Sequence, residues 1–351
     1  MKKALFIVFG GTNKPSSRYR VFQFLNHIPE EVDLQYKILS TPQKSATRNF
    51  PRFLRGVVHA FNLVMFYFLI SYYCIRWADK VFIQKTILPK VVISLLIINR
   101  TPFIYDFDDA IYMPFSTQKN SRKRRSKIEA LIFQLKNAET VIAGNRVLQE
   151  YALQFRSECE VIPTVIDLET YCVQANIQSF NFTIGWIGTS QNLVFLDQIE
   201  HPLRVLRQEF PQLNLLVICD KPYKLDDMVI NKTWGKETEI DDMLLMDIGI
   251  MPLSDDEWTR GKCSFKAIQY MALGIPTIVS PIGMNAEVIE DGVNGYWATT
   301  EDEWIIKLRN IIVNPSLRQT FSTRGRKKAE KNYSLQVWLT RWYQLLLAKR
   351  T

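Results

Sequence analysis

Short apolar runs alternate with helix-length segments along this chain. A first series of runs stands at residues 3–9, 80–83, 103–105 and 140–143, and a second series begins at 183–188. Such alternation is typical of parallel β-sheets, in which a helix crosses over between one strand and the next. The pattern therefore predicts an α/β fold with two parallel domains. The weak periodicity of residues 165–179 predicts the linker between them.

The length of 351 residues accommodates two domains of ordinary size. We expect an N-terminal domain over residues 1–172, a C-terminal domain over 173–331, and a final helix over 332–351 that can return to the N-terminal domain. The first predicted strand runs into Gly10 and Gly11. This is the carboxyl edge of the sheet, where doubly wound folds bind their ligands.

The stretch from 261 to 276 joins cations, a helix and a strand in one short unit. Gly261 lets the backbone approach a ligand, while Lys262 and Lys266 supply positive charge. The apolar spacing after Lys262 predicts a helix whose N-terminus adds oriented N–H groups, which favour anions. An ordinary helix–turn–strand unit with surface lysines explains the same residues, but the combination favours a diphosphate site.

Three further motifs surround this loop in a fixed order. Asp-Ile-Gly-Ile-Met-Pro-Leu precedes it, Ile-Pro-Thr-Ile-Val-Ser follows the predicted helix, and Glu-Val-Ile-Glu-Asp-Gly-Val-Asn-Gly comes last. Residues 245–297 thereby resemble the donor-binding half of retaining glycosyltransferases of the GT-B type, and are most similar to family four of that classification. The resemblance implies two Rossmann-like domains facing each other across a cleft. It also implies sugar transfer from a nucleotide sugar with retention, without a metal or other cofactor.

The phosphate-binding cations depart from the family pattern. The family places an Arg after the first strand of the second domain, whereas this chain has Gly188-Thr189-Ser190 there. Because charge grows on the leaving diphosphate, we assign its stabilisation to Arg260 and Lys262. The remaining expected donor contacts are Gly188, Thr189, Ser190, Ser264, Phe265 and Lys266.

The glutamate pair of the family is also changed, since its two members fall on Gly261 and Gln269. The second glutamate normally accepts hydrogen bonds from the ribose, which the carbonyl of Gln269 can do less strongly. A plain helix-surface residue is the alternative. Glu287 either contacts donor hydroxyls or places a negative charge at a helix N-terminus. Gly283 lets the backbone approach the donor.

The N-terminal domain is expected to bind the acceptor. Gly10 and Gly11 lie at its ligand edge, and the candidate phosphate ligands are Arg18 and Arg20, for which a solvated loop is the alternative. A strand then ends in Tyr-Asp-Phe-Asp-Asp. We expect Asp108 or Asp109 to contact the sugar or to orient the acceptor hydroxyl. Helix capping is the competing interpretation.

Two other functions fit some of these residues. The spacing of Asp106 and Asp108 is that of the metal-binding carboxylates of single-domain, manganese-dependent glycosyltransferases. A nucleotide-sugar epimerase can share the two-domain fold, and a non-enzymatic basic protein that binds membranes or nucleic acid is the third alternative. We expect a glycosyltransferase that acts on a glycan or lipid-linked acceptor in surface polysaccharide or glycoconjugate synthesis.

Positive charge is concentrated in the first half of the chain. Residues 1–170 contain 24 Lys and Arg against 14 Asp and Glu, and the densest cluster is Arg122 to Arg125. Such a face can dock to anionic lipid, bind nucleic acid or remain solvated. Because no nucleic-acid motif accompanies it, we expect an anionic membrane surface as partner and no nucleic acid.

An uncharged, aromatic-rich segment over 56–75 bears on the same question. Its length permits a membrane span, but a crossover helix is required at this point of the predicted sheet. We expect a crossover helix that lays its aromatic face into a bilayer interface.

Cysteine and histidine content indicates the compartment. Five cysteines without a C-x-x-C pair and three scattered histidines predict free thiols and no metal centre. The N-terminus shows no cleavable signal pattern. These features predict a cytoplasmic protein, peripheral on the inner face of the cell membrane.

Overall fold

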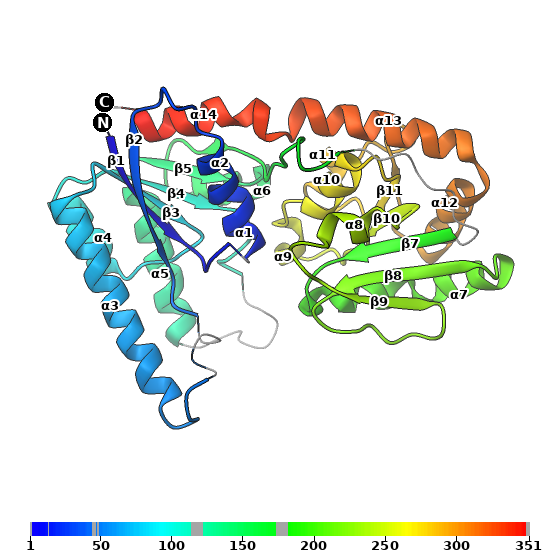
Figure 1. Cartoon of the computed structure of the whole chain (residues 1–351), viewed down its shortest axis with the longest axis horizontal. Helices are drawn as coiled ribbons and strands as arrows, with labels where there is room; N and C mark the ends of the chain where they lie inside the picture. The colour runs from blue at the N-terminus through cyan, green and yellow to red at the C-terminus, as the bar shows by residue number, and fades with distance from the viewer. Residues whose placement is uncertain are drawn as a thin grey trace. The chain divides into compact units, whose positions relative to one another are not determined.

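The computed structural model describes residues 2–12, 14–43, 47, 49–113, 122–172 and 182–348. It consists of two compact units, one formed by residues 1–164 with 338–351 and the other by 165–337. Each unit contains a six-stranded sheet in which the paired strands are parallel, together with the helices that cover it (Figure 1). The α/β architecture expected from the alternating apolar runs is therefore confirmed.

The sheet of the N-terminal unit has the strand order β2-β1-β3-β4-β5-β6. Its strands are β1 (Lys2–Val8), β2 (Leu34–Ser40), β3 (Lys80–Gln84), β4 (Phe103–Phe107), β5 (Thr140–Ala143) and β6 (Glu160–Val161). Its helices are α1 (Pro15–Ser17), α2 (Gln23–Asn26), α3 (Arg55–Arg76), α4 (Lys90–Ile98), α5 (Arg122–Asn137), α6 (Arg146–Leu153) and the C-terminal α14 (Leu335–Leu347).

The central strands of this sheet are covered on both faces. All five residues of β3 and all five of β4 are buried, as expected where helices lie on each side of a parallel sheet. The indole of Trp342 on α14 stacks at 5.9 Å from Phe6 on β1 and at 4.9 Å from Phe24 on α2. The C-terminal helix therefore belongs to the core of the N-terminal unit.

The segment 56–75 lies within α3, which connects β2 to β3 as the predicted crossover helix. Its buried residues are Phe66, Ile70 and Cys74. Their spacing of four places them on one face of the helix, which packs toward the sheet. The rest of the surface of α3 takes little part in the core.

The sheet of the C-terminal unit has the order β12-β11-β10-β7-β8-β9. Its strands are β7 (Phe182–Ile187), β8 (Leu213–Cys219), β9 (Val229–Thr233), β10 (Ile248–Met251), β11 (Thr277–Val279) and β12 (Tyr296–Trp297). Its helices are α7 (Glu200–Glu209), α8 (Glu239–Met243), α9 (Glu257–Arg260), α10 (Phe265–Ala272), α11 (Asn285–Val288), α12 (Glu301–Val313) and α13 (Pro315–Asn332).

The division between the units differs from the predicted boundary at 172/173. Residues 165–172 belong to the C-terminal unit, because Ile166 forms a β-bridge with Ser334 and the Tyr171 hydroxyl contacts Glu239. Residues 173–179 of the predicted linker lie outside the described residues. Long-range pairing thus assigns to the second unit a segment whose own periodicity is weak.

Candidate active site

Gly188 follows β7 at a point where no larger residue fits. A Cβ atom built there would lie 2.5 Å from the ring of Trp186 and 3.0 Å from Cε of Lys266. The first clash is with a rigid ring, so the backbone at Gly188 needs to remain without a side chain. This close approach brings the carboxyl end of β7 against the first turn of α10, which carries Lys266.

The loop between α9 and α10 is held in one conformation by polar contacts. Asp256 caps α9 through a reciprocal capping box with Thr259. Ser264, in the left-handed region with φ of 49°, donates a 2.6 Å hydrogen bond from its hydroxyl to Asn285 Oδ1. The Asn285 amide in turn donates to the carbonyl of Ser280 at 2.9 Å. The loop is therefore tied to the segment that follows β11.

Gly283 serves the packing of this same loop. Its φ is +55°, and an added Cβ would lie 2.3 Å from the carbonyl oxygen of Arg260. The requirement for glycine here comes from the backbone contact between the two loops. A close approach to a donor, as expected from the sequence, stays a prediction.

One lysine of this loop and one of the first turn of α10 lie near aromatic rings. Lys262 Nζ is 3.6 Å from the ring centroid of Trp258 and 3.2 Å from Asn192 Oδ1. Lys266 Nζ is 5.4 Å from the ring centroid of Trp186. Burial, together with the nearby charge of Lys262, lowers the pKa of Lys266 to about 7.

Lys266 lacks an acidic partner within the described part of the chain. No described carboxylate contributes to the pKa of its ammonium, and its contact with the ring of Trp186 supplies only weak stabilisation of the charge. A depressed pKa is the physical signature of a cation without a counter-ion. An anionic ligand at the end of β7 would supply that counter-ion.

Three of the expected donor ligands contact protein groups, and their contact with a donor stays a prediction. Arg260 pairs with Asp255 at 2.6 Å on the surface. The backbone N–H and hydroxyl of Ser190 donate to Asp220 at 2.7 and 2.9 Å, and Thr189 Oγ1 accepts a 2.9 Å hydrogen bond from Asn192. These contacts fix the shape of the loop after β7. They leave the two lysines as the stronger candidates for contact with a diphosphate.

Gln269 is a buried residue and not a helix-surface one. It is 3% exposed, and its amide nitrogen donates 2.7 Å hydrogen bonds to both Tyr171 Oη and Glu239 Oε1. Trp234 Nε1 donates to the other oxygen of Glu239 at 2.8 Å. The surface alternative is therefore wrong, because tertiary contacts enclose this side of α10. Glu287, by contrast, is exposed in the first turn of α11.

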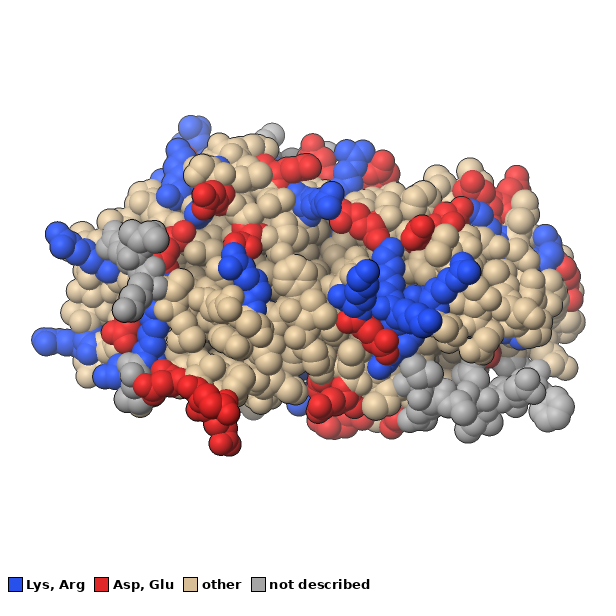
Figure 2. All heavy atoms as spheres, turned by 90° about the horizontal axis from the view of Figure 1, so that it is seen from above, with Lys and Arg blue, Asp and Glu red and all other residues tan. Residues whose placement is uncertain are grey.

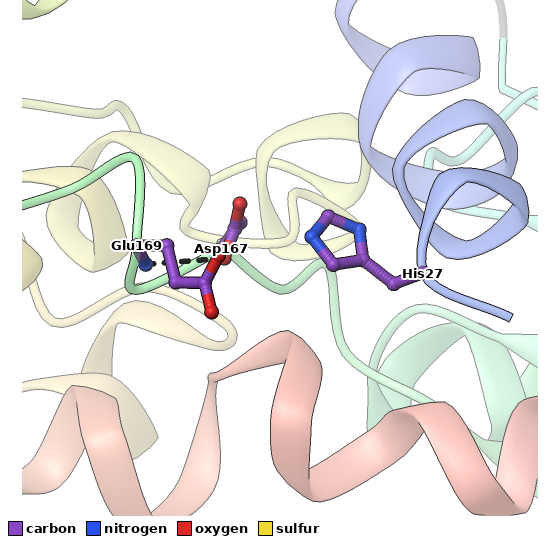
Figure 3. A group of neighbouring side chains, drawn as sticks. All are labelled: His27, Asp167 and Glu169. Carbon is purple, nitrogen blue, oxygen red and sulfur yellow. Dashed lines mark hydrogen bonds between the residues drawn. The ribbon is translucent and has the colours of Figure 1, made fainter. Parts of the chain in front are cut away.

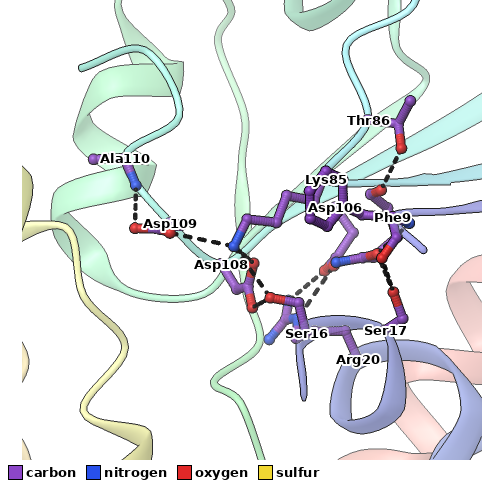
Figure 4. A network of polar contacts seen from close by, with 11 residues as sticks. Phe9, Ser16, Ser17, Arg20, Lys85, Thr86, Asp106, Asp108, Asp109 and Ala110 are labelled. Carbon is purple, nitrogen blue, oxygen red and sulfur yellow. Dashed lines mark hydrogen bonds and ion pairs between the residues drawn. The ribbon is translucent and has the colours of Figure 1, made fainter. Parts of the chain in front are cut away.

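In the N-terminal unit, Arg20 forms a buried ion pair with Asp106 (Figure 4). The two side chains are 2% and 1% exposed, Nε lies 3.1 Å from Oδ2, and a second guanidinium nitrogen donates to the carbonyl of Ile162. Burial raises the pKa of Asp106 despite the charge of Arg20. Arg20 thus has a structural counter-ion, and the expected contact with an acceptor phosphate does not apply to it in this arrangement.

A second cation, Lys85, was not anticipated from the sequence. Its ammonium lies 3.2 Å from both Asp108 and Asp109 and 3.1 Å from Ser16 Oγ (Figure 4). Burial alone would raise the pKa of Asp108, but the charges of Lys85 and Arg20 and the hydrogen bond from Ser16 lower it overall. Asp108 is accordingly a carboxylate held at the carboxyl edge of the sheet. The position of Lys85 directly after β3 was the only available signal.

The loop after β1 is the other part of the expected acceptor side. Gly10 has φ of +77° and its N–H donates to Thr41 Oγ1 at 3.0 Å, while Gly11 is exposed and an added Cβ would meet no atom within 4 Å. Arg18 lies 4.5 Å from the ring centroid of Tyr19. Only Gly10 therefore shows a backbone reason for glycine.

Asp167 organises the turn that leads to Tyr171. Its carboxylate accepts hydrogen bonds from the backbone N–H of Glu169 at 3.1 Å and from Thr170 Oγ1 at 2.9 Å (Figure 3). His27, drawn in the same figure, belongs to the N-terminal unit, where its Nδ1 is 2.8 Å from the carbonyl oxygen of Gln23. The expected absence of a histidine metal centre stays a prediction.

Comparison with known proteins is consistent with this geometry. A family model described as glycosyl transferases group 1 matches residues 205–328, which include both lysines. No curated protein sequence matches the chain significantly. Sucrose-phosphate synthase from Thermosynechococcus elongatus is similar in structure with a TM-score of 0.71 at 14% identity, covering 99% of this chain and 98% of that one.

Two other solved structures show the same likeness. HepE of Anabaena, in complex with UDP and glucose, has a TM-score of 0.70 at 16% identity, with 99% and 100% of the two chains covered. A glycosyltransferase from Rickettsia africae has a TM-score of 0.67 at 14% identity, with coverages of 98% and 97%. The GT-B fold is thus shared over the whole chain. With the group 1 match in its C-terminal unit, the chain is a glycosyltransferase.

Proposed function

We propose that the chain transfers a sugar from a nucleoside-diphosphate sugar, bound by its C-terminal unit, to a glycan or lipid-linked acceptor. The observation that carries this proposal is the pair formed by Lys262 and Lys266, the second of which has a pKa lowered to about 7 and faces the glycine-dependent end of β7. A diphosphate at this place would neutralise both charges. The UDP in the structure of HepE supports UDP as the first nucleotide to test.

The main requirement of the reaction is to stabilise the negative charge that develops on the leaving diphosphate. As the bond between the anomeric carbon and the phosphate oxygen breaks, the electron pair goes to the diphosphate, while the acceptor oxygen bonds to the anomeric carbon and gives its proton to an oxygen of the departing diphosphate. Fixed cations that meet this growing charge lower the barrier. Lys262 and Lys266 have the charge and the fixed position for that task, since the α9–α10 loop is held by Asn285.

The finer features of the reaction are also part of the proposal. Retention of anomeric configuration and kinship with family four are supported by the motif order over 245–297. Independence from metal is supported by the cations that already neutralise Asp106 and Asp108, namely Arg20 and Lys85. The ionised Asp108 is proposed to orient the acceptor hydroxyl, in surface polysaccharide or glycoconjugate synthesis.

Calorimetric titration with UDP tests donor binding. We expect wild-type protein and Lys236→Met, a substitution of an exposed lysine in the same unit, to bind alike, and Lys266→Met to bind at least tenfold more weakly, about 1.4 kcal/mol. A ligand at one hundred times its dissociation constant should stabilise the fold by about 2.7 kcal/mol in a thermal melt. Equal affinity for UDP in all three proteins would contradict the assignment.

A turnover assay separates transferase from epimerase. The protein is incubated with UDP-glucose and other common nucleotide sugars, with and without a glycan or lipid-linked acceptor, and the products are resolved by mass spectrometry. Acceptor-dependent release of nucleotide with a new glycoside is expected. Conversion to an isomeric sugar that proceeds equally well without any acceptor would favour the epimerase.

A further inference from the structure

The helix α3 presents an apolar stripe to solvent along its whole length. The members of this stripe are all at least half exposed and follow one another at intervals of three or four residues: Val57, Phe61, Val64, Phe68, Tyr72 and Ile75. These intervals keep them on one face of a helix, separate from the face of Phe66, Ile70 and Cys74 that packs inward. Soluble surfaces seldom expose so many large apolar side chains in one row.

The N-terminal half of α3 has no buried residue, because burial begins only at Phe66. In Figure 1 this half extends past the ends of the strands of its own unit. Just before it, Phe53 is 79% exposed. The outer face of this half of α3 therefore carries apolar side chains that no described residue of the unit buries.

The end of α4 also exposes a large apolar side chain. The side chain of Asn99, which follows α4, donates a 2.8 Å hydrogen bond to the carbonyl of Cys74, so the end of α4 lies beside the second half of α3. Ile98 at this end is 78% exposed. The exposed surface is therefore broader than a single helix.

The stretch of sequence that contains α3 carries charge of one sign. Between Asp33 and Asp79 the sequence has no Asp or Glu but six Lys and Arg. Arg55 and Arg76 stand at the two ends of α3, and Lys37 lies 4.9 Å from the ring centroid of Tyr73. Apolar and aromatic residues flanked by cations match the boundary between acyl chains and anionic headgroups.

Charge alone does not single out this face. Figure 2 looks down on the side of α13 and α14, where Lys and Arg side chains gather among Asp and Glu. On α13, Arg318 donates to the carbonyls of Ile311 and Ile312 at 2.7 Å, and Lys328 donates to that of Glu287 at 2.8 Å. These cations have structural roles. What distinguishes α3 is the combination of cations with an exposed apolar stripe.

We propose that α3, with the end of α4, is a docking surface for an anionic lipid bilayer and lies parallel to the membrane plane. Helix α3 has 22 residues and a mean hydropathy of 1.6 over its most apolar window, so length and composition alone would permit a span. Both of its ends, however, connect to strands of one sheet, and three residues separate Arg76 from β3. A spanning orientation would draw that sheet into the lipid, whereas a parallel one leaves the sheet in water.

Vesicle co-sedimentation tests this surface. The full-length protein is mixed with vesicles of phosphatidylcholine containing about one third phosphatidylglycerol, and with pure phosphatidylcholine. We expect binding to the anionic vesicles, and at least tenfold weaker binding by the variant Phe61→Ser/Val64→Ser/Phe68→Ser. The matched control is Val194→Ser/Ile306→Ser/Val313→Ser, three similarly exposed apolar residues of the C-terminal unit, which should bind as the wild type does.

Further arms separate the alternatives. UDP binding by the α3 variant should equal that of the wild type, so a failure here is distinguishable from a failure of the proposed function. Arg122→Gln/Arg124→Gln/Arg125→Gln should weaken vesicle binding less than the α3 variant does. Wild-type vesicle binding by the α3 variant would overturn the proposal, as would a lipid-free dimer, seen by sedimentation velocity, that the α3 variant abolishes. Resistance of the bound protein to alkaline carbonate would show a spanning helix instead.

Discussion

The amide nitrogen of Gln269 on α10 lies 2.7 Å from the carboxylate of Glu239 on α8, and the two side chains are 3% and 4% exposed. The same carboxylate receives hydrogen bonds from Tyr171 and Trp234. One buried carboxyl group thus joins α8, α10 and the segment that enters the C-terminal unit. Its role is to position α10, whose first turn carries Lys266.

Replacement of Glu239 should therefore destabilise the C-terminal unit. Glu239→Ala removes the acceptor of three hydrogen bonds, those from Gln269, Tyr171 and Trp234, for which we expect a loss of about 3 kcal/mol in the free energy of unfolding. Urea denaturation followed by tryptophan fluorescence measures it. Glu237→Ala, which removes an exposed carboxylate two residues away, should change stability by less than about 0.5 kcal/mol. A similar small effect of both substitutions would contradict the structural role of the network.

The two cations of the α9–α10 loop region should differ in their importance for turnover. Lys262→Ala is expected to lower kcat by about a hundredfold, close to 3 kcal/mol of leaving-group stabilisation. Arg260→Ala should have a much smaller effect, because its guanidinium is paired with Asp255 at the surface. Steady-state kinetics with a saturating donor compares them. If Arg260→Ala were the more damaging change, the sequence-based assignment of Arg260 to the phosphate would be restored.

Donor affinity should depend on the protonation of Lys266. Its pKa is about 7 in the ligand-free protein, and a diphosphate beside it favours the ammonium and raises that pKa. Binding then takes up a proton, so affinity is highest below pH 7 and falls as the pH rises above it. UDP-glucose is a better probe than UDP, since a terminal phosphate itself titrates near pH 6. Titration calorimetry in buffers of different ionisation enthalpy measures the uptake, which Lys266→Met should abolish.

The same lysine affects stability with the opposite sign. Its pKa in the folded protein lies below the unfolded value of about 10.4, so between about pH 7 and 10 the unfolded chain binds more protons. Ligand-free protein should therefore gain stability as the pH rises through this window. Lys266→Met should remove that slope and melt at a higher temperature than the wild type at pH 7. A lower melting temperature would show that Lys266 stabilises the fold in the absence of ligand.

A saturating chelator should leave the transfer rate unchanged. Arg20 and Lys85 already neutralise Asp106 and Asp108, the pair whose spacing would suit a metal-bridged diphosphate. The rate with EDTA is compared with the rate in the presence of added Mn²⁺. Complete loss of activity that manganese restores would favour the metal-dependent alternative, in which Asp106 and Asp108 bind the metal.

Much of the architecture could be predicted from apolar periodicity. The runs at 80–83, 103–105 and 140–143 became β3, β4 and β5, whose buried residues need to be apolar in any sheet covered on both faces. Edge strands escaped prediction. β2 has mostly exposed or half-buried residues, and β9 is exposed at its centre, so their sequences lack the continuous apolar run.

The sequence by itself determined the alternation of central strands with helices, the basic loop at 261–266 and the uncharged segment of α3, because each is a property of neighbouring residues. Only the tertiary structure decided which polar side chains pair with other protein groups. Arg20 pairs with Asp106, which is 86 positions away in the sequence. Gln269 donates a hydrogen bond to Tyr171, which is 98 positions away. A hydrogen bond in the interior depends on groups brought together by packing, and no local pattern records that partner.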